Sequence, residues 1–443
     1  MQKMTRFVLV LTFSALCLGT WAAPDNESPP KPLSLAECLE IAERNQEDLL
    51  TAQNNLAIAG SRLSRAKGDY YPQVSLRNTA FVIDDKDAAP SAVVGSGLWG
   101  AMGSRSDTGT ALTVTQNFFD GGLRETTVQG ARYGVDRNRA ALTRMWQTTV
   151  FGVTRAYYDL LRAERLAEVS RENVKYNEAL REQILAQAEA GEVAPVDVYP
   201  VEAQLANARV DLLTAENTAR NSALALQAAM GVLPQTGFAI EDVDGEPSIT
   251  PLPPKEHVDL ALQARADLAA VRADRSAAAA SVKSARISIY PRPVITGTYQ
   301  KDISGGITSD LTEITGGVVF DLFDGGANQA TLREAKASED NARLQIIQTE
   351  RSIRTQVEEA YINLTNAQER LKASTVSLEA STKNFEAQKE RYINGLANTL
   401  DLLNAEVQLV TARSSEVRAR YDYYTAVAQL EYAVGGQGGT DGK

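Results

Sequence analysis

The sequence predicts a mixed α/β membrane protein that combines long antiparallel helical hairpins with four β-strands in each chain. Three observations predict it. The motif Phe-Asp-Gly-Gly occurs at 119–122 and again at 323–326, and the two copies continue without a gap to Gly231 and Gly435. A long proline-free stretch follows each motif, and segments of alternating polarity precede it. Such self-similarity indicates one body built from two copies of a unit.

Identical residues fix the register between the copies. The matched positions are Val153 and Val357, Tyr157 and Tyr361, Gly191 and Gly395, Asp197 and Asp401, and Glu202 and Glu406. Upstream the copies align at a different spacing, with Asp48-Leu49 matching Asp267-Leu268 and Tyr71-Pro72 matching Tyr290-Pro291. The difference in length between the copies must therefore lie between the Tyr-Pro and Phe-Asp-Gly-Gly motifs.

The chain divides into five predicted segments. Residues 1–22 read as a secretory signal peptide, with Lys3 and Arg6 before an apolar run. Leu16 precedes Cys17, so no lipid anchor is expected. The remaining segments are a first repeat at 23–231 (β-hairpin about 73–118, helical hairpin 123–231), a linker or equatorial segment at 232–257, a second repeat at 258–435 (β-hairpin about 292–322, helical hairpin 327–435) and a disordered tail at 436–443.

Composition excludes several classes of protein. The formal net charge is −11 with no basic cluster, which argues against a nucleic-acid partner. One cysteine, Cys38, remains after removal of the signal peptide, so no internal disulfide can form. The single histidine, His257, lies in a proline-rich segment. Without a nucleophile–base pair or metal-ligand spacing, we expect no enzyme, no cofactor and no bound metal.

Local signals place the elements of each copy. A capping box at Ser34 and Glu37 begins a helix, which we expect to break near Asn45 and resume to about Lys67. Pro72 ends it, and Pro291 does the same in the second copy, because proline forbids the preceding turn's hydrogen bond. Each strand pair is expected to end in a turn into a long helix, at Asp120, Gly121 and Gly122 and at Asp324, Gly325 and Gly326.

The stretches 124–190 and 327–394 are the predicted long helices, each about 100 Å at about 1.5 Å per residue. Gly191 and Gly395 are expected to end them as C-cap residues. A returning helix follows each tip, and one helix is expected over 258–289. In each copy the two shorter helices sum to about the length of the long one. We therefore expect them to stack end to end beside it.

The strands raise the question of closure. A strand needs about 9–11 residues to cross a bilayer, which each candidate approaches. A four-stranded sheet in lipid would leave its edges unpaired, so it would have to close with other chains, giving eight strands from two chains or twelve from three. The alternative is a pair of small soluble hairpins capping a helical bundle.

With these features together, the chain resembles the TolC family of outer-membrane efflux proteins over essentially its whole mature length. The resemblance rests on the duplication, the Tyr-Pro and Phe-Asp-Gly-Gly motifs, and the tip segments 191–197 and 395–405. It implies a homotrimer in a Gram-negative outer membrane, with a 12-stranded β-barrel in lipid and a 12-helix tunnel across the periplasm. It also implies an exit duct for efflux or type I secretion, working with a periplasmic adaptor and an inner-membrane pump of RND, ABC or MFS type.

The resemblance also implies a gate. Asp401 would form a ring of three carboxylates that attracts cations at the tunnel mouth. Where family members carry a second acidic residue this chain has Asn404, so cation blockade should be weaker. Tyr392 and Arg391 could reach Asp197 on the neighbouring hairpin as a latch. The simpler alternatives are a first-turn acid that meets the helix dipole, for Asp401, and ordinary surface packing, for the latch residues.

The hairpin tips are the expected docking surface for the adaptor. Gly191, Val193, Gly395 and Leu396 are the small or apolar positions there, although the glycines also serve as helix caps. Aromatic residues that bracket the strands suggest an interfacial girdle, or packing at the junction: Tyr70, Tyr71, Phe118, Phe119, Tyr290, Phe320 and Phe323.

Two other classes of protein fit the pattern less well. A periplasmic adaptor should have one helical hairpin flanked by β-rich halves, whereas this chain has two hairpins and two strand pairs. A structural coiled-coil protein should lack the Gly-Gly junctions between strand and helix.

Overall fold

The computed structural model describes residues 32–84, 104–191, 193–235, 237–242, 253–304 and 307–436. The predicted signal peptide at 1–22 lies outside the described residues, as do residues 85–103 of the first predicted β-hairpin, residues 243–252 of the linker and residues 437–443 of the predicted tail.

The described elements alternate between helices and a single sheet. The helices are α1 (Leu35–Asn45), α2 (Glu47–Gly68), α3 (Leu123–Glu189), α4 (Val198–Ala229), α5 (Pro254–Ala264), α6 (Ala266–Ile289), α7 (Ala327–Ile393) and α8 (Thr399–Val434), with a short 3-10 turn at Pro195–Asp197. The strands are β1 (Gln73–Asp84), β2 (Ser104–Phe119), β3 (Arg292–Ser304) and β4 (Ile307–Val319).

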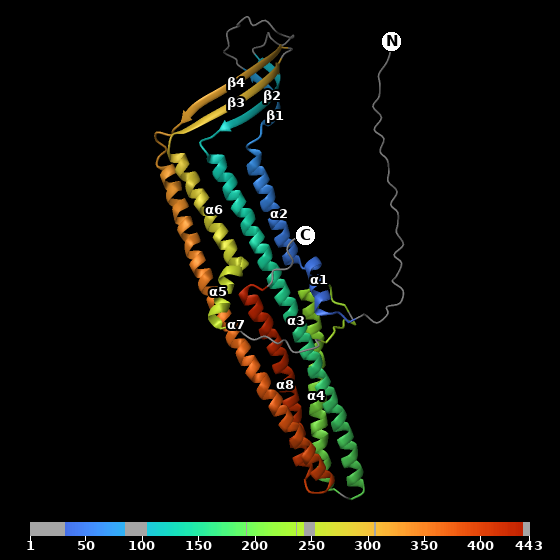
Figure 1. Ribbon diagram of the computed structural model, residues 1–443. Helices are drawn as coiled ribbons and strands as arrows, with labels where there is room; N and C mark the ends of the chain where they lie inside the picture. Colours follow the sequence, from blue (N-terminus) through green and yellow to red (C-terminus); the bar gives the residue numbers. More distant parts are fainter. Residues whose placement is uncertain are drawn as a thin grey trace, which may run out of the picture.

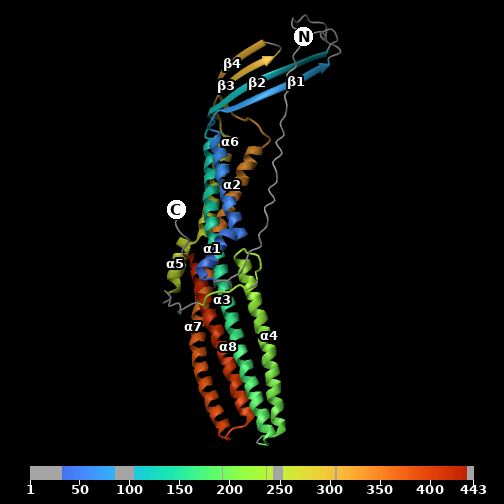
Figure 2. The ribbon, with the colours of Figure 1, turned by 90° about the vertical axis from the view of Figure 1, so that its right-hand side faces the viewer.

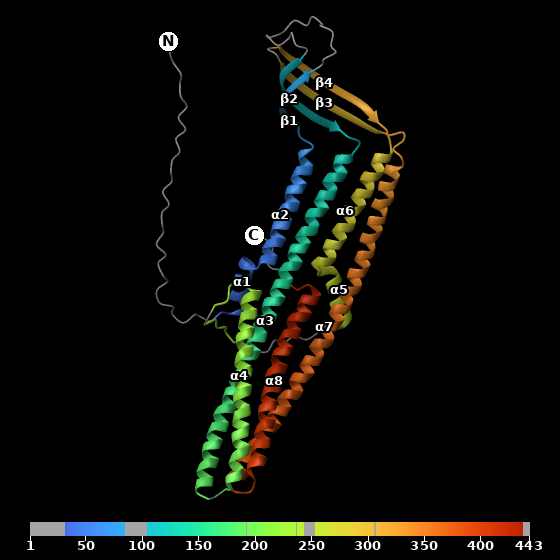
Figure 3. The ribbon, with the colours of Figure 1, turned by 180° about the vertical axis from the view of Figure 1, so that it is seen from behind.

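The helices form an elongated layer with the sheet at one end (Figure 1). At the other end are the two tips, where the chain reverses between α3 and α4 and between α7 and α8. The two long helices α3 and α7 have 67 residues each, which corresponds to about 100 Å. Along α3 lie α2 in the half nearer the sheet and α4 in the half nearer the tips, while α6 and α8 lie along α7 in the same way (Figure 3). The second copy packs on the first through α3, which contacts both α6 and α8.

Each pair of stacked helices meets at a glycine with positive φ. Gly231, at φ 69°, follows α4, and a Cβ there would lie 2.7 Å from the carbonyl oxygen of Asn45. Gly435, at φ 94°, follows α8, and its Cβ would lie 3.1 Å from Cγ of Arg265. Glycine is thus needed at both joints for the backbones to approach.

The structure corrects one predicted helix. We expected a single helix over 258–289, but the chain is extended at Arg265, between α5 and α6, with ψ 124°. The first copy breaks in the same way at Gln46, next to the expected break at Asn45. The helix also begins at Pro254, inside the segment expected as linker, because proline suits the first turn of a helix. The break lets the end of α8 pack against Arg265.

The four strands form one antiparallel sheet in the order β1-β2-β3-β4 (Figure 2). Strands β2 and β3 join the two copies, with Leu112 opposite Lys301 and a register shift between Asn117 and Phe119. The strands have 12 to 16 residues, longer than the expected ten or so. Strands β1 and β4 are the two edges of this sheet.

The main core lies at mid-height, where α1, α3, α5, α7 and α8 meet. Tyr157 of α3 is buried, and its hydroxyl donates to the carbonyl oxygens of Glu241 at 2.6 Å and Leu33 at 3.2 Å. Leu33 and Ile240 form a parallel bridge beside it. Tyr157 thereby fixes both the entry to α1 and the segment that leaves α4.

Candidate functional site

The two helical tips lie side by side at the end of the layer away from the sheet (Figure 1). Gly191 at φ 76° and Gly395 at φ 67° reverse the chain after α3 and α7. At the second tip, Leu396 N donates to Arg391 O at 2.8 Å and Gly395 N to Tyr392 O at 3.0 Å. These two hydrogen bonds satisfy carbonyl groups that the end of the helix would leave unpaired.

An apolar cluster, here called the tip cluster, joins the two hairpins just above these turns. Its buried members are Leu180, Ile184, Val198, Val201, Leu402 and Leu403, from α3, α4 and α8. Phe385 and Tyr392 of α7 pack against it, and the Phe385 ring meets Tyr176 of α3 edge-on at 5.5 Å between centroids. The relative position of the tips is therefore set by apolar packing.

Asp401 lies in the first turn of α8 with an exposed side chain. Its N–H donates to Asn398 Oδ1 at 2.8 Å, and its carboxylate accepts from Asn398 N at 3.4 Å. The two residues form a capping box, which stabilises the start of the helix. Asn404, one turn further along α8, is also exposed. Asp401 therefore has a local structural role, and its carboxylate remains open to solvent.

The expected latch residues lie at the tips and make local contacts within the chain. The Tyr392 hydroxyl donates to Gln187 Oε1 of α3 at 3.1 Å, a partner that the sequence did not indicate. Arg391 donates to the carbonyl of Leu396 in its own turn at 3.3 Å. Asp197 is half-buried ahead of α4. A contact from Tyr392 or Arg391 to Asp197 stays a prediction for the assembled protein.

The predicted docking positions differ in exposure. Gly191, Gly395 and Leu396 are exposed, whereas Val193 is half-buried against the tip cluster. Further exposed apolar side chains, which were not among the predicted positions, lie close to the turns: Val196, Tyr199, Ile393 and Leu400. They occupy helix positions that face away from the cluster, and periodicity around the turns could have found them.

A buried carboxylate was also missed. Glu406 of α8 is 3% exposed and accepts a hydrogen bond from Asn177 Nδ2 of α3 at 2.5 Å. Burial raises the pKa of Glu406 to about 7, although the Asn177 bond opposes the shift. Its repeat counterpart Glu202 is exposed and paired with Arg181. The signal in the sequence is Phe385, which occupies the position of that arginine in the second copy.

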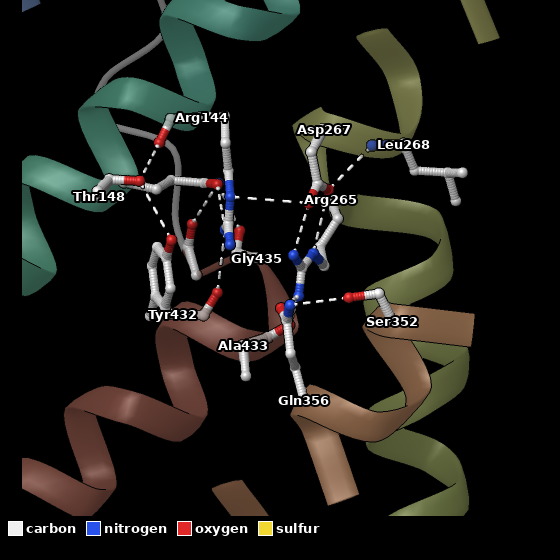
Figure 4. A network of polar contacts seen from close by, with 12 residues as sticks. Arg144, Thr148, Arg265, Asp267, Leu268, Ser352, Gln356, Tyr432, Ala433 and Gly435 are labelled. Atoms are coloured by element: carbon white, nitrogen blue, oxygen red, sulfur yellow. Dashed lines mark hydrogen bonds and ion pairs between the residues drawn. The ribbon is translucent and has the colours of Figure 1, made fainter. Parts of the chain in front are cut away.

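A polar network closes the joint between α8 and the α5–α6 break (Figure 4). Arg265 is buried, donates to the Ala433 carbonyl at 3.2 Å and pairs with Asp267 at 2.5 Å. From α3, the Arg144 guanidinium lies 4.0 Å from the Tyr432 ring centroid, and Gln147 donates to Gly435 O at 2.9 Å. Cationic and amide donors thus meet the carbonyls at the end of α8, where the helix dipole is negative.

The strand-to-helix turns have one geometry in both copies. Asp120 accepts from Gly122 N at 3.1 Å and from Arg124 N at 2.8 Å. Asp324 accepts from Gly326 N and Asn328 N at 2.9 and 2.6 Å. Glycines with positive φ stand at Gly121, Gly122, Gly325 and Gly326. The Tyr-Pro motifs with Pro72 and Pro291 precede β1 and β3, so each strand pair is bounded by rigid turns.

None of the helices in the described ranges has an apolar run long enough to span a bilayer. Within those ranges, no group of three or more His, Cys, Asp and Glu side chains is arranged to hold a metal ion.

Known proteins share this architecture. The outer membrane protein VceC of Vibrio cholerae superposes with a TM-score of 0.78 at 21% identity, covering 91% of this chain and 96% of that one. The outer membrane protein TolC of Vibrio cholerae is 24% identical over 448 residues, 98% of this chain and 96% of the relative. The outer membrane efflux protein BepC of Brucella suis is 23% identical over 412 residues, 91% and 85% of the two chains.

The fold is therefore that of the TolC-like outer-membrane channels, mostly helical with a small antiparallel sheet. The family model described as "Outer membrane efflux protein" matches residues 38–232 and 257–436, which make up most of the chain. The chain belongs to the outer membrane efflux protein family. Its place is accordingly the Gram-negative outer membrane, with a periplasmic extension.

Proposed function

We propose that three copies of this chain form a passive exit duct for efflux or type I secretion. The sheets of the three chains close a 12-stranded barrel in the outer membrane, and their helical layers form a 12-helix tunnel across the periplasm. The duct catalyses no reaction and needs no cofactor. The observation that carries this proposal is the four-stranded sheet, whose edge strands β1 and β4 have no outer partner among the described residues.

One face of the sheet carries exposed apolar side chains, as expected for strands that face lipid. Val74 and Leu76 of β1 are 66% and 72% exposed and lie on one face, two residues apart. On β4, Ile314 and Val318 are exposed in the same alternating phase. Such a surface suits lipid, but lipid offers no partners to the edges β1 and β4, so they must pair with neighbouring chains. Four strands from each of three chains give the even number that outer-membrane barrels use.

The tips supply the gate in this proposal. Threefold symmetry places three Asp401 carboxylates around the tunnel mouth, where they attract cations and repel anions. Asn404 leaves the second position neutral, so cations are held less firmly than by two acidic rings. In the trimer, Tyr392 and Arg391 are the donors available to Asp197 of an adjacent hairpin.

Channels of this family work with a periplasmic adaptor and an inner-membrane pump. We place the adaptor at the tips, where Leu396 is 69% exposed beside Gly191 and Gly395. The half-buried Val193 contributes backbone there more than side chain. The pump, of RND, ABC or MFS type, selects the cargo, because a wide tunnel closed only at its tips has little means to discriminate.

Edge pairing tests the proposal directly. Cysteines placed along β1, starting from Val74, and along β4, starting from Val318, are cross-linked in membranes that contain the full chain. We expect disulfides between chains for one set of registers and a covalent ladder that stops at three chains. A ladder that stops at two chains, or cross-links confined to single chains, would contradict the closed trimer. Cysteine pairs on β2, whose two neighbours are already in the sheet, are the matched control.

A further inference from the structure

The second helical hairpin has lost an ion pair that the first hairpin keeps. In the first, Arg181 of α3 donates to Glu202 of α4 at 2.9 Å, with both side chains about half exposed. In the second, Phe385 stands in the arginine's place and Glu406 in the glutamate's. Phe385 packs against the tip cluster, and Glu406 is buried at the contact between α8 and α3. A carboxylate here is thus held without a cation from its own hairpin.

The atoms around Glu406 favour its neutral form. Asn177 is fully buried, and its Nδ2 donates to Glu406 Oε1 and to the Asn173 carbonyl at 2.5 and 2.9 Å. Glu406 Oε2 and Asn177 Oδ1 are both buried acceptors without a hydrogen-bond donor among the described residues. Protonation turns Glu406 Oε2 from an unpaired acceptor into a hydroxyl donor at a site where acceptors lack donors. Ionisation leaves a buried charge with one amide partner, which is unfavourable.

Among the described residues, the titratable groups around Glu406 supply no opposing charge. Tyr176 of α3 faces Glu406, and its pKa is raised mainly by burial and then by the Glu406 charge. Tyr392 of α7 is the next phenol, and its hydroxyl donates to Gln187 Oε1 of α3. The arginines on the adjoining surfaces pair elsewhere. Arg181 of α3 pairs with Glu202 of α4, Arg209 of α4 with Glu178 of α3, and Arg413 of α8 with Glu172 of α3. Asp401, on α8 itself, is exposed to solvent.

We propose that Glu406 is a proton-dependent fastener between the two hairpins: protonated, it keeps α8 seated on α3 and the tips closed, and ionised, it releases them. This inference rests on the proposed channel function. Glu406 lies close to the tunnel mouth, because it is little more than one helical turn beyond Asp401 on α8. Movement of α8 away from α3 therefore moves the carboxylates at the tunnel mouth.

The sign of the pH effect follows from linkage. With α8 packed on α3, the pKa of Glu406 is about 7, against an ordinary 4.5 once the side chain is exposed to water. The closed state therefore binds the proton more tightly, is favoured at acid pH, and loses that advantage as the pH rises from about 4.5 to about 7. Between pH 5 and pH 8 the closed-to-open ratio of one chain falls by about 70-fold on these values.

The test uses the full-chain trimer in planar bilayers, recorded from pH 5 to pH 8. We expect the open probability of the wild type to rise with pH. Glu406→Gln, a neutral isostere with an N–H donor, is expected to stay closed at every pH. Glu202→Gln, at the exposed repeat counterpart, is the matched control and should keep the wild-type response. A flat wild-type profile, or a wild-type response in Glu406→Gln, would overturn the proposal.

A second readout separates this inference from the channel itself. Infrared difference spectra between pH 6 and pH 8 should contain a protonated-carboxyl band that Glu406→Gln lacks and Glu202→Gln keeps. Open channels with no such band would overturn the fastener and leave the proposed function standing. The band without conductance in any variant would remove the channel function, and with it the gating role of Glu406.

Discussion

Arg265 and Asp267, two residues apart at the α5–α6 break, form a two-pronged ion pair with N–O distances of 2.5 and 3.1 Å. The Arg265 side chain is 2% exposed and also binds Gln356 of α7 and the carbonyl of Ala433 at the end of α8 (Figure 4). One arginine thus connects the break, the long helix and the end of the returning helix. In the first copy the equivalent residue is Gln46, which carries no charge.

Removing the partner of this arginine should destabilise the joint. Asp267→Ala leaves a buried guanidinium without its counter-charge, and we expect a loss of about 2–3 kcal/mol in the free energy of unfolding, less than for a fully buried pair because Asp267 is partly exposed. Thermal unfolding of the detergent-solubilised oligomer measures it. Asp274→Ala removes the partner of the exposed Arg137 and should cost less than about 1 kcal/mol. Equal effects from the two variants would contradict this assignment.

The same pair predicts how the joint responds to acid. Burial raises the pKa of Asp267, but the hydrogen bond and charge of Arg265 outweigh it and the net pKa is lowered. The carboxylate therefore contributes stability above its unfolded value of about 3.9, and this contribution disappears as the pH falls through the lower folded value. Unfolding temperatures measured from pH 7 to pH 3 should fall less steeply in Asp267→Asn than in the wild type. A steeper fall in the variant would contradict the sign.

The Tyr392–Gln187 bond predicts a small effect on tip closure. Tyr392→Phe removes one hydroxyl from an otherwise apolar contact and should favour the open tips by about 1 kcal/mol, a roughly fivefold change in open probability. Single-channel recording measures it. Tyr199→Phe is the control, because that side chain lies near the same tips and is 67% exposed. If both variants behave like the wild type, the bond has no part in closure.

Asp401 combines two roles that substitutions can separate. Asn398→Ala removes the cap of α8 and should cost about 1 kcal/mol in stability with selectivity unchanged. Asp401→Ala should weaken the cap and also reduce the preference for cations over anions, measured as a reversal potential in a salt gradient. Asn404→Asp should raise that preference by adding a second acidic position. If neither Asp401→Ala nor Asn404→Asp changes the ion selectivity, the proposed acidic ring is contradicted.

Two glycines with the same conformation predict unequal costs. Gly121 and Gly325 have φ of 74° and 70°, but a Cβ at Gly121 would lie 2.8 Å from the Cβ of Arg292, whereas Gly325 has open space. Both Gly→Ala changes strain the backbone by about 1 kcal/mol. Only Gly121→Ala also pushes β3 away, so its unfolding temperature should be the lower of the two. Equal temperatures would show that the contact with Arg292 carries no constraint.

Much of the helical layer could be predicted because its signals are local and occur twice. Gly191 and Gly395 each follow a long proline-free stretch, and both adopt positive φ where the chain turns. The break at Arg265 was missed although its register was available, since Asp48 and Asp267 match and Asn45 had already been expected to break a helix. A charged residue between two helical stretches carries no breaking signal of its own.

The contacts between hairpins could not be predicted in the same way. Gln187 and Asn177 are polar residues on a long helix, and nothing local distinguishes them from their exposed neighbours. Their importance comes from the angle at which α7 and α8 pack on α3, which depends on the whole layer. For Glu406, the sequence signal of burial is that Phe385 replaces Arg181 of the first copy.

The most direct measurement is single-channel conductance of the purified full-chain oligomer in a planar bilayer. We expect a small, cation-selective conductance in the wild type that loses its selectivity in Asp401→Ala and rises when Tyr392→Phe and Asp197→Ala are combined. A folded, detergent-purified oligomer that inserts into the bilayer and conducts no ions would contradict the central claim that this chain forms a channel.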